Sequence, residues 1–435
     1  MVKEEFKHLQ LSDIDKLMQI EDERVQIAEL DDVTRWIELA LNRIPAFAKH
    51  SKSLLKIEEY FDETGLEGDD LHLWRAYRDL FAQRFSGIYD DILEVTDVIA
   101  TDLFKYFLSH QQLKTAKSRF SKEAIPFTFL GRSEDYYFTY THDMERPIAV
   151  ISIPQGRVSS VWNWLAIPHE IGHNIFAHFI DYEDELWGKI KTNLKEHKFR
   201  INRINLSRST CARKIVESIW RFWLDELVAD VFGVLFTGPS FAMSRQEDAI
   251  QAANQLGDAH LNVWDVEGMA MSKHPTALIR PLLANRILKE LGFNRECDDL
   301  NKRWNQIIER YEPNDELLWV DYKHGERIEL FTIQVNEILK SFNVVLPVVL
   351  NSKMKCFDGA RLLDILQFNT IDYTFARIVA EDLIKGVGEF DRFIKPRHIL
   401  AASRIAFESN PDEADNIHTS AMKGLIHHKK KHMDD

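Results

Sequence analysis

Cysteines and long apolar runs are both scarce in this chain of 435 residues. The three cysteines, Cys211, Cys297 and Cys356, lie far apart and form no C-x-x-C pair, which excludes a disulfide framework and a structural zinc knuckle. No run of about eighteen apolar residues occurs, so we expect no membrane insertion. The opening residues have no apolar segment behind a basic start, so we expect no signal peptide and a cytoplasmic location.

An excess of positive charge is also lacking. The formal net charge is −14 at pH 7, which argues against nonspecific binding to nucleic acid or to anionic lipid. The hydrophobic content of 45% allows a large buried core. These two properties together indicate a soluble globular protein.

The sequence does contain one motif with a clear chemical purpose, H-E-x-x-H, inside residues 161–178. His169 and His173 are four residues apart, so on a helix they lie one turn apart on the same face and can bind one metal ion. Glu170 would then sit beside the metal, where it can take a proton from water. The alternative is an amphipathic helix whose histidines face solvent or the backbone.

A second segment, residues 215–236, supports the metal interpretation. It is apolar almost all the way round, as a buried helix is, yet it contains Glu226 and Asp230. Burying an ionised carboxylate costs several kcal/mol or more unless a cation or strong donor is present. We therefore expect Glu226 to be the third ligand and Asp230 to orient His169. The alternative is an exposed acidic edge that also includes Asp225.

The sequence offers two other possible positions for the third metal ligand. Metzincins continue their motif with a glycine and a histidine, but those positions here are Phe176 and Phe179. His178 points to another side of the helix, so we interpret it as a surface or core histidine.

Three motifs in order, HEIGH at 169–173, DELVAD at 225–230 and HPTALIR at 274–280, resemble those of gluzincin metallopeptidases, especially the HtpX and CAAX-prenyl-protease group. The resemblance covers roughly residues 148–290. It implies that His274 contacts the carbonyl of the substrate and that Arg280 supports the site. His260 is the alternative residue for the carbonyl contact.

The periodicity predicts a mainly α fold with a small antiparallel β-sheet. We expect a helical region over 1–120, a zincin-like catalytic domain over 121–292, and a helical region over 293–435 that ends in a disordered tail. The runs 126–130, 135–141 and 147–153 read as an antiparallel meander. Its last strand is the candidate edge that a peptide could join, the alternative being a fully paired interior strand.

These observations predict a zinc-dependent peptidase that acts on a peptide or protein substrate, with Glu170 as general base. Two alternatives stay open: a zinc amidohydrolase with a different substrate, and a helical binding module with a structural zinc. The oligomeric state does not follow from the sequence.

Overall fold

The computed structural model describes residues 83, 90–118, 126–131, 138–140, 149–205, 211–256, 259–265, 273–311, 315–323 and 326–433. Most of the predicted N-terminal helical region therefore lies outside the described residues. The described part of that region is mainly α7 (Asp90–Leu108), a helix as predicted. Within the described chain the fold is mostly helical with two small sheets, so the predicted mainly α class is correct at this level.

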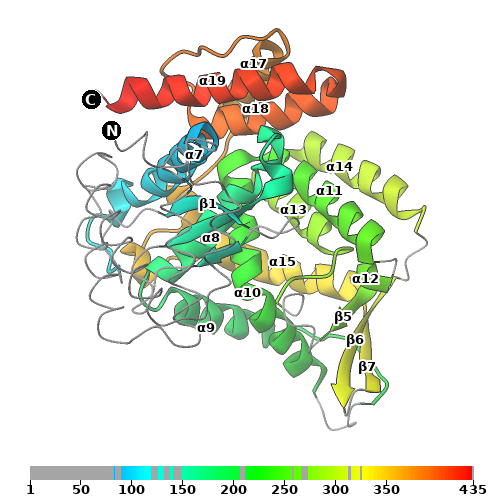
Figure 1. Cartoon of the computed structure of the whole chain (residues 1–435). Coiled ribbons are helices and arrows are strands. Elements are labelled where there is room, and N and C mark those ends of the chain that lie inside the picture. The colour runs from blue at the N-terminus through cyan, green and yellow to red at the C-terminus, as the bar shows by residue number, and fades with distance from the viewer. Residues whose placement is uncertain are drawn as a thin grey trace, which may run out of the picture.

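The longest described helix, α10 (Ala212–Thr237), lies at the centre of the molecule (Figure 1). It packs against α8, α9, α11, α13, α15 and α18, which explains why it is apolar on nearly every side. The run TGPSF at 237–241 predicts a helix stop, and Gly238 does end α10, with a positive φ of 59°, before α11 begins at Pro239. The helices around α10 are α8 (Ala166–His178), α9 (Tyr182–Leu194), α11 (Pro239–Leu256), α13 (Arg280–Glu290), α15 (Val335–Asn351) and α18 (Pro396–Ser409).

Pro168 lies in the first turn of α8, where the backbone N–H groups have no partner within the helix, so the proline forfeits no helical hydrogen bond. The residues before it form a separate 3-10 turn, η4 (Val161–Asn163). Pro281 is likewise in the first turn of α13 and marks its start, whereas the sequence suggested a start near Pro275 and a kink at Pro281.

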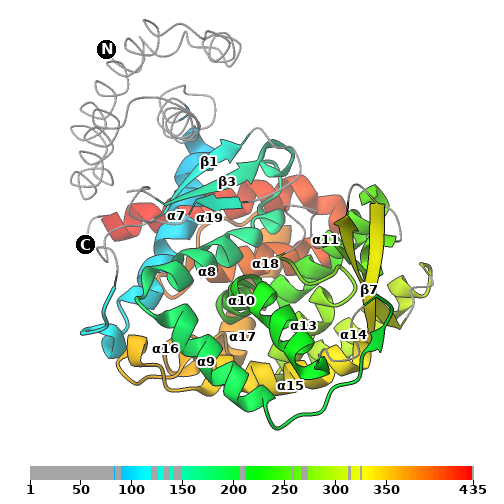
Figure 2. The same ribbon diagram turned by 90° about the horizontal axis from the view of Figure 1, so that it is seen from below.

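The first sheet corrects the predicted meander. Its strands are β1 (Phe127–Gly131), β2 (Phe138–Tyr140) and β3 (Val150–Pro154), but their order is β1-β3-β2. β3 pairs with β1 in parallel and with β2 in antiparallel orientation, so it is an interior strand and the predicted edge was wrong. All five residues of β3 are buried, which fits an interior strand, and it lies beside β1 in Figure 2.

The second sheet contradicts part of the predicted C-terminal helical pattern. It has the order β4-β7-β6-β5 and contains the hairpin of β6 (Glu316–Lys323) and β7 (Glu326–Gln334). The spacing of Ile328 and Phe331 predicts that both lie on one stripe of a helix, but both lie in β7. The other two strands are β4 (Asn202–Arg203), antiparallel to β7, and β5 (Val263–Asp265), parallel to β6.

The C-terminal residues form a helical layer beside α7 (Figures 1 and 2). The last helix runs to Met433, and Lys429 forms an ion pair of 2.9 Å with Glu94 of α7, so the prediction of a disordered tail was wrong as far as Met433. The remaining helical elements are α12 (Ala259–Asn262), α14 (Asn294–Ile308), α16 (Leu362–Ile365), α17 (Thr370–Ile384) and α19 (Ala414–Met433), with the 3-10 turns η2 (Gln111–Leu113), η3 (Gln155–Arg157), η5 (Lys355–Phe357) and η6 (Pro411–Glu413).

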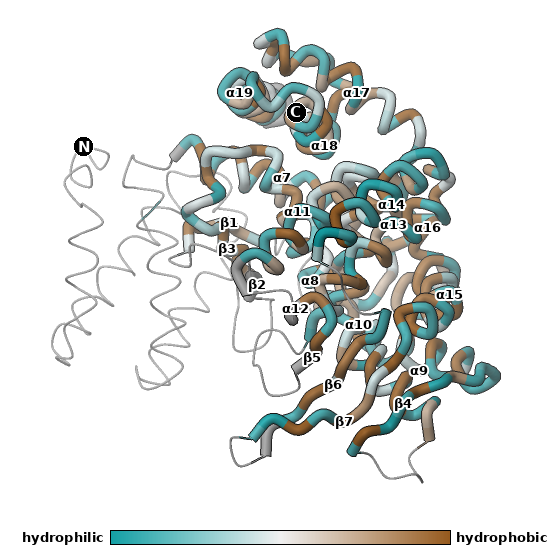
Figure 3. Tube along the Cα trace, turned by 90° about the vertical axis from the view of Figure 1, so that its right-hand side faces the viewer, coloured by the Kyte–Doolittle hydropathy of each residue, from teal (hydrophilic) through white to brown (hydrophobic). Residues whose placement is uncertain are grey.

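One hydrophobic core extends from Leu93 to Leu425 and includes residues on both sides of the domain boundaries predicted at 120 and 292. Polar and apolar residues alternate along the helices of Figure 3. Among the residues that the structure describes, no helix is both long and apolar enough to cross a membrane.

Candidate metal centre

Helices α8 and α10 bring three potential ligands together. His169 and His173 come from α8 and Glu226 from α10, and all three side chains are buried. One ligand atom from each lies within 4.8 Å of the other two, and no other such group of His, Cys, Asp and Glu occurs in the described part of the chain. The structure thus places together the three residues that the sequence predicted as ligands.

The distances within this group fit a tetrahedral metal site. The two Nε2 atoms of His169 and His173 are 3.1 Å apart, and they lie 3.3 and 3.4 Å from the two carboxylate oxygens of Glu226. Bonds of 2.0–2.1 Å at tetrahedral angles would separate neighbouring ligand atoms by about 3.3 Å. The three donors can therefore hold an ion such as Zn²⁺ with little rearrangement.

The remaining ring nitrogens face carboxylates. The Nδ1 atom of His169 is 2.9 Å from Oδ1 of Asp230, the residue that was predicted from the sequence to orient it. The Nδ1 atom of His173 forms a 2.9 Å hydrogen bond with Oδ1 of Asp225, for which the sequence predicted no such contact. Both contacts favour the tautomer whose Nε2 is free to bind metal.

A glycine allows the two helices to approach so closely. A Cβ atom added to Gly172 would lie 2.8 Å from Cα of Ala229 and 2.9 Å from Cβ of Phe232. Because Ala229 lies between Glu226 and Asp230, this close contact brings the acids of α10 within reach of the histidines of α8.

Arg280 and His274 surround the Glu226 carboxylate. Arg280 donates two hydrogen bonds to Asp230, of 2.7 Å from Nε and 2.9 Å from a terminal nitrogen, and a 3.3 Å bond to Glu226. His274 places Nε2 3.0 Å from Oε2 of Glu226, and its side chain is 39% exposed. His274 thus lies between the ligands and solvent. His260 lies in α12.

The charges of the group suit a bound cation. Burial alone would raise the pKa of Glu226, but His274 and His173 hold it well below its usual value. Burial would lower the pKa of His173, but Asp225 and Glu226 raise it well above the ordinary value. Positive charge is therefore stabilised at this point, and a metal ion would compete there with the protons on the imidazoles.

Glu170 is 5% exposed and follows His169 on α8. Burial raises its pKa, while the neighbouring His169 and His173 oppose the shift. A carboxylate with a raised pKa is a better base than an exposed one, and Glu170 combines this property with a place beside the ligands.

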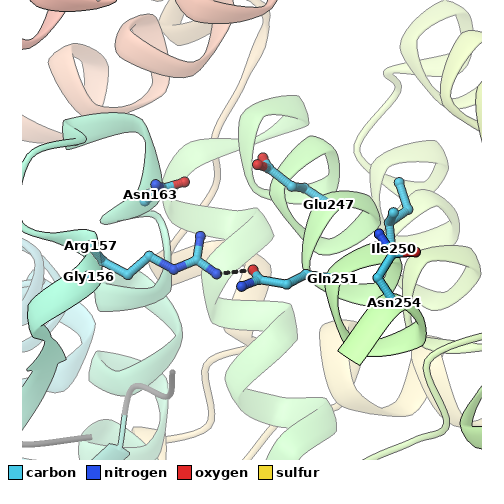
Figure 4. Close-up of a pocket in the computed structure, with 7 residues that line it drawn as sticks. All are labelled: Gly156, Arg157, Asn163, Glu247, Ile250, Gln251 and Asn254. Atoms are coloured by element: carbon cyan, nitrogen blue, oxygen red, sulfur yellow. Dashed lines mark hydrogen bonds between the residues drawn. The ribbon is translucent and has the colours of Figure 1, made fainter. Parts of the chain in front are cut away.

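A separate pocket of about 470 Å³ lies between η3 and α11. In Figure 4, Arg157 reaches across it and donates a hydrogen bond to Gln251 of α11. None of the metal-site residues lines this pocket. Helix α11 contacts both the pocket and the candidate metal centre, because its Phe241 stacks on the ring of His169 with the centroids 6.4 Å apart.

Comparison of the chain with models of protein families, with curated proteins and with solved structures finds no match. The chemistry of the centre must therefore be inferred from its own residues.

Proposed function

We propose that the chain is a zinc-dependent peptidase of the gluzincin type, as its motifs suggest. The observation that carries the proposal is the convergence of His169, His173 and Glu226 at tetrahedral distances, with Glu170 beside them. Two neutral imidazoles and one carboxylate form a ligand set typical of catalytic zinc, which keeps a fourth position open.

A Zn²⁺ ion held by these residues would act as a Lewis acid and lower the pKa of water to about 7. Glu170 is the residue placed to accept the proton of that water and to return it to the leaving amine. The raised pKa of Glu170 brings it closer to the operating pH, where such a proton exchange is most effective.

His274 would contact the substrate, and Arg280 would hold the acidic side chains of the site in place. The exposed position of His274 beside Glu226 suits a donor to the oxyanion that develops on the peptide carbonyl. Arg280 is occupied by Asp230 and Glu226, so we assign it the role of holding both acids in place.

A peptide that joins the first sheet would have to pair with an outer strand, β1 or β2, because β3 is occupied on both sides; we favour β2 because it is the one next to α8. β2 lies next to α8, and Asn174 of α8 donates a 2.8 Å hydrogen bond to Thr139 of β2. Strand addition at β2 would thus bring an extended substrate alongside the helix that carries Glu170.

The presence of Glu170 argues against a purely structural zinc, because a structural site has no use for a base and closes its fourth position with a protein ligand. A zinc amidohydrolase with a different substrate would use the same residues. A panel of peptides and small amides distinguishes the two enzymes.

The test combines metal analysis with proteomic cleavage profiling of the wild type and three variants. Glu170→Gln should retain the metal and lose activity by about 10²–10⁴-fold, since it removes only the base. Glu226→Ala should lose the metal. Glu290→Gln, a change of an exposed residue on α13, should alter neither. Full metal content in Glu226→Ala, or cleavage that persists in Glu170→Gln, would refute the proposal.

A further inference from the structure

The positive charge of the chain is unevenly distributed. Residues 189–221, from α9 to the first half of α10, contain ten lysines and arginines but two acidic residues, which gives this segment a net charge of +8. Since the whole chain carries −14, the other residues carry −22. A concentrated basic segment on an acidic protein attracts anionic partners to one place.

This segment forms a groove of about 410 Å³ between α9 and α10. Five of the side chains that line the groove are basic and two are aromatic, Trp187 and Phe222. We call it the basic groove. Phe222 is 53% exposed, although the apolar pattern of residues 215–236 predicts a buried side chain at this position.

Three of the five cations are available to a ligand. Arg213 pairs with Glu217 at 3.2 Å, and Arg221 pairs with Glu183 at 2.8 Å. Three lysines are exposed and form no ion pair with other residues in the described part of the chain: Lys191, Lys195 and Lys214. Carboxylates bound among these lysines would relieve the repulsion between them.

The aromatic walls indicate the kind of anion. Arg221 lies over the ring of Trp187 at 5.7 Å, and Phe222 stands exposed on the α10 side. A small inorganic anion would use the lysines alone, whereas a peptide with acidic and apolar residues would contact both the lysines and the rings.

One face of α10 runs from the basic groove towards the candidate metal centre. Ser218, Phe222 and Asp225 occupy successive turns of this face, and Asp225 bonds to His173. Ser218 and Asp225 are separated by about 10 Å along the helix axis. An extended peptide covers that distance with about three residues.

From these observations we infer that the basic groove binds an acidic segment of the protein substrate a few residues away from the bond to be cleaved. The inference rests on the proposed peptidase function. Nucleic acid is the less favoured occupant, because a long polyanion would also face the strongly acidic remainder of the protein.

Binding can be measured without cleavage. The probe is a fluorescein-labelled decapeptide of alternating Glu and Phe, added to the full-length Glu170→Gln protein and followed by fluorescence anisotropy. The matched probe has Gln in place of Glu. The acidic probe should bind at least about tenfold more tightly at low salt, and the difference should fall steeply at high salt.

Charge reversal at the groove is compared with charge reversal elsewhere. The triple variant Lys191→Glu, Lys195→Glu and Lys214→Glu should weaken binding by about tenfold or more. The same changes at the exposed lysines Lys289 on α13, Lys302 on α14 and Lys385 directly after α17 should weaken it less than twofold. Equal losses in both variants would overturn the inference.

Two more outcomes are decisive. If a labelled single-stranded oligonucleotide binds more tightly than the acidic peptide, the groove is a nucleic-acid site and the inference is overturned. The assay needs neither metal nor turnover. If the acidic probe binds the groove but the metal-loaded wild type cleaves no peptide, the proposed function is refuted and the groove remains a peptide-binding site, which separates the two failures.

Discussion

His173 binds through Nδ1 to Oδ1 of Asp225 at 2.9 Å, and Asp225 directly precedes Glu226 on α10. Two adjacent residues of α10 thus contact the two different ring nitrogens of His173. Oε1 of Glu226 lies 3.4 Å from the Nε2 atom, and Asp225 accepts from the Nδ1 atom. The side chain of Asp225 is 49% exposed, so it can be replaced without leaving a buried cavity.

The first prediction concerns this contact. Asp225→Asn should lower the zinc affinity by about 10–100-fold, because the ring of His173 loses the carboxylate that sets its orientation and basicity. The affinity is measured by competition with a chromophoric chelator. Asp299→Asn, at a 74% exposed position on α14, is the control and should leave the affinity unchanged. Equal affinities for wild type and Asp225→Asn would show that the contact does not support the ligand.

The second prediction concerns the approach of α8 to α10. Gly172→Ala should destabilise the protein by about 1–3 kcal/mol, because the new methyl group would lie 2.8 Å from the backbone of Ala229 and push the helices apart. It should also weaken metal binding. Urea unfolding with and without zinc measures both effects. Gly188→Ala on α9 is the matched control, since its Cβ would meet nothing within 4 Å, and it should be neutral or slightly stabilising.

The third prediction separates His274 from His260. His274→Ala should lower kcat by about 10²–10³-fold and retain the metal, since it removes a donor to the oxyanion and no ligand. His260→Ala should change kcat little, because His274 is the residue whose Nε2 lies 3.0 Å from Glu226. A larger loss of kcat in His260→Ala would reverse this assignment.

The fourth prediction concerns pH and a site remote from the metal. Burial raises the pKa of Asp102 on α7 from 3.8 to about 6, although Arg397 and Lys395 oppose the shift. A carboxyl whose folded pKa exceeds its unfolded pKa contributes stability that is present below about pH 4 and lost as the pH rises through 6. Its side chain remains 24% exposed, so we expect a contribution of about 1–3 kcal/mol.

The variant Asp102→Asn has no titrating carboxyl at this position. Its comparison with the wild type therefore measures the contribution of Asp102 to stability at each pH. The variant should match the wild type in urea unfolding below pH 4 and exceed its stability above pH 7. A difference between the two proteins that stays constant across this range would show that Asp102 does not titrate as described.

The helices of the centre could be predicted because their signals are local. The four-residue spacing of His169 and His173, the apolar surroundings of Glu226 and Asp230, and the stop at Gly238 each depend on neighbours within a few turns. The hairpin of β6 and β7 was missed for the opposite reason. Ile328 and Phe331 have a helix-like spacing, but pairing with the distant β6 overrides it.

The sequence by itself determined which side chains could form a metal site: two imidazoles on one helix face, and two acids on a helix that is otherwise apolar. Only the tertiary structure decided how these parts meet. It placed β3 inside its sheet, assigned Asp225 to His173, and turned Phe222 outwards beside the basic groove. The physical reason is that strand order, helix rotation and side-chain exposure depend on contacts between segments far apart in the chain, which no local pattern records.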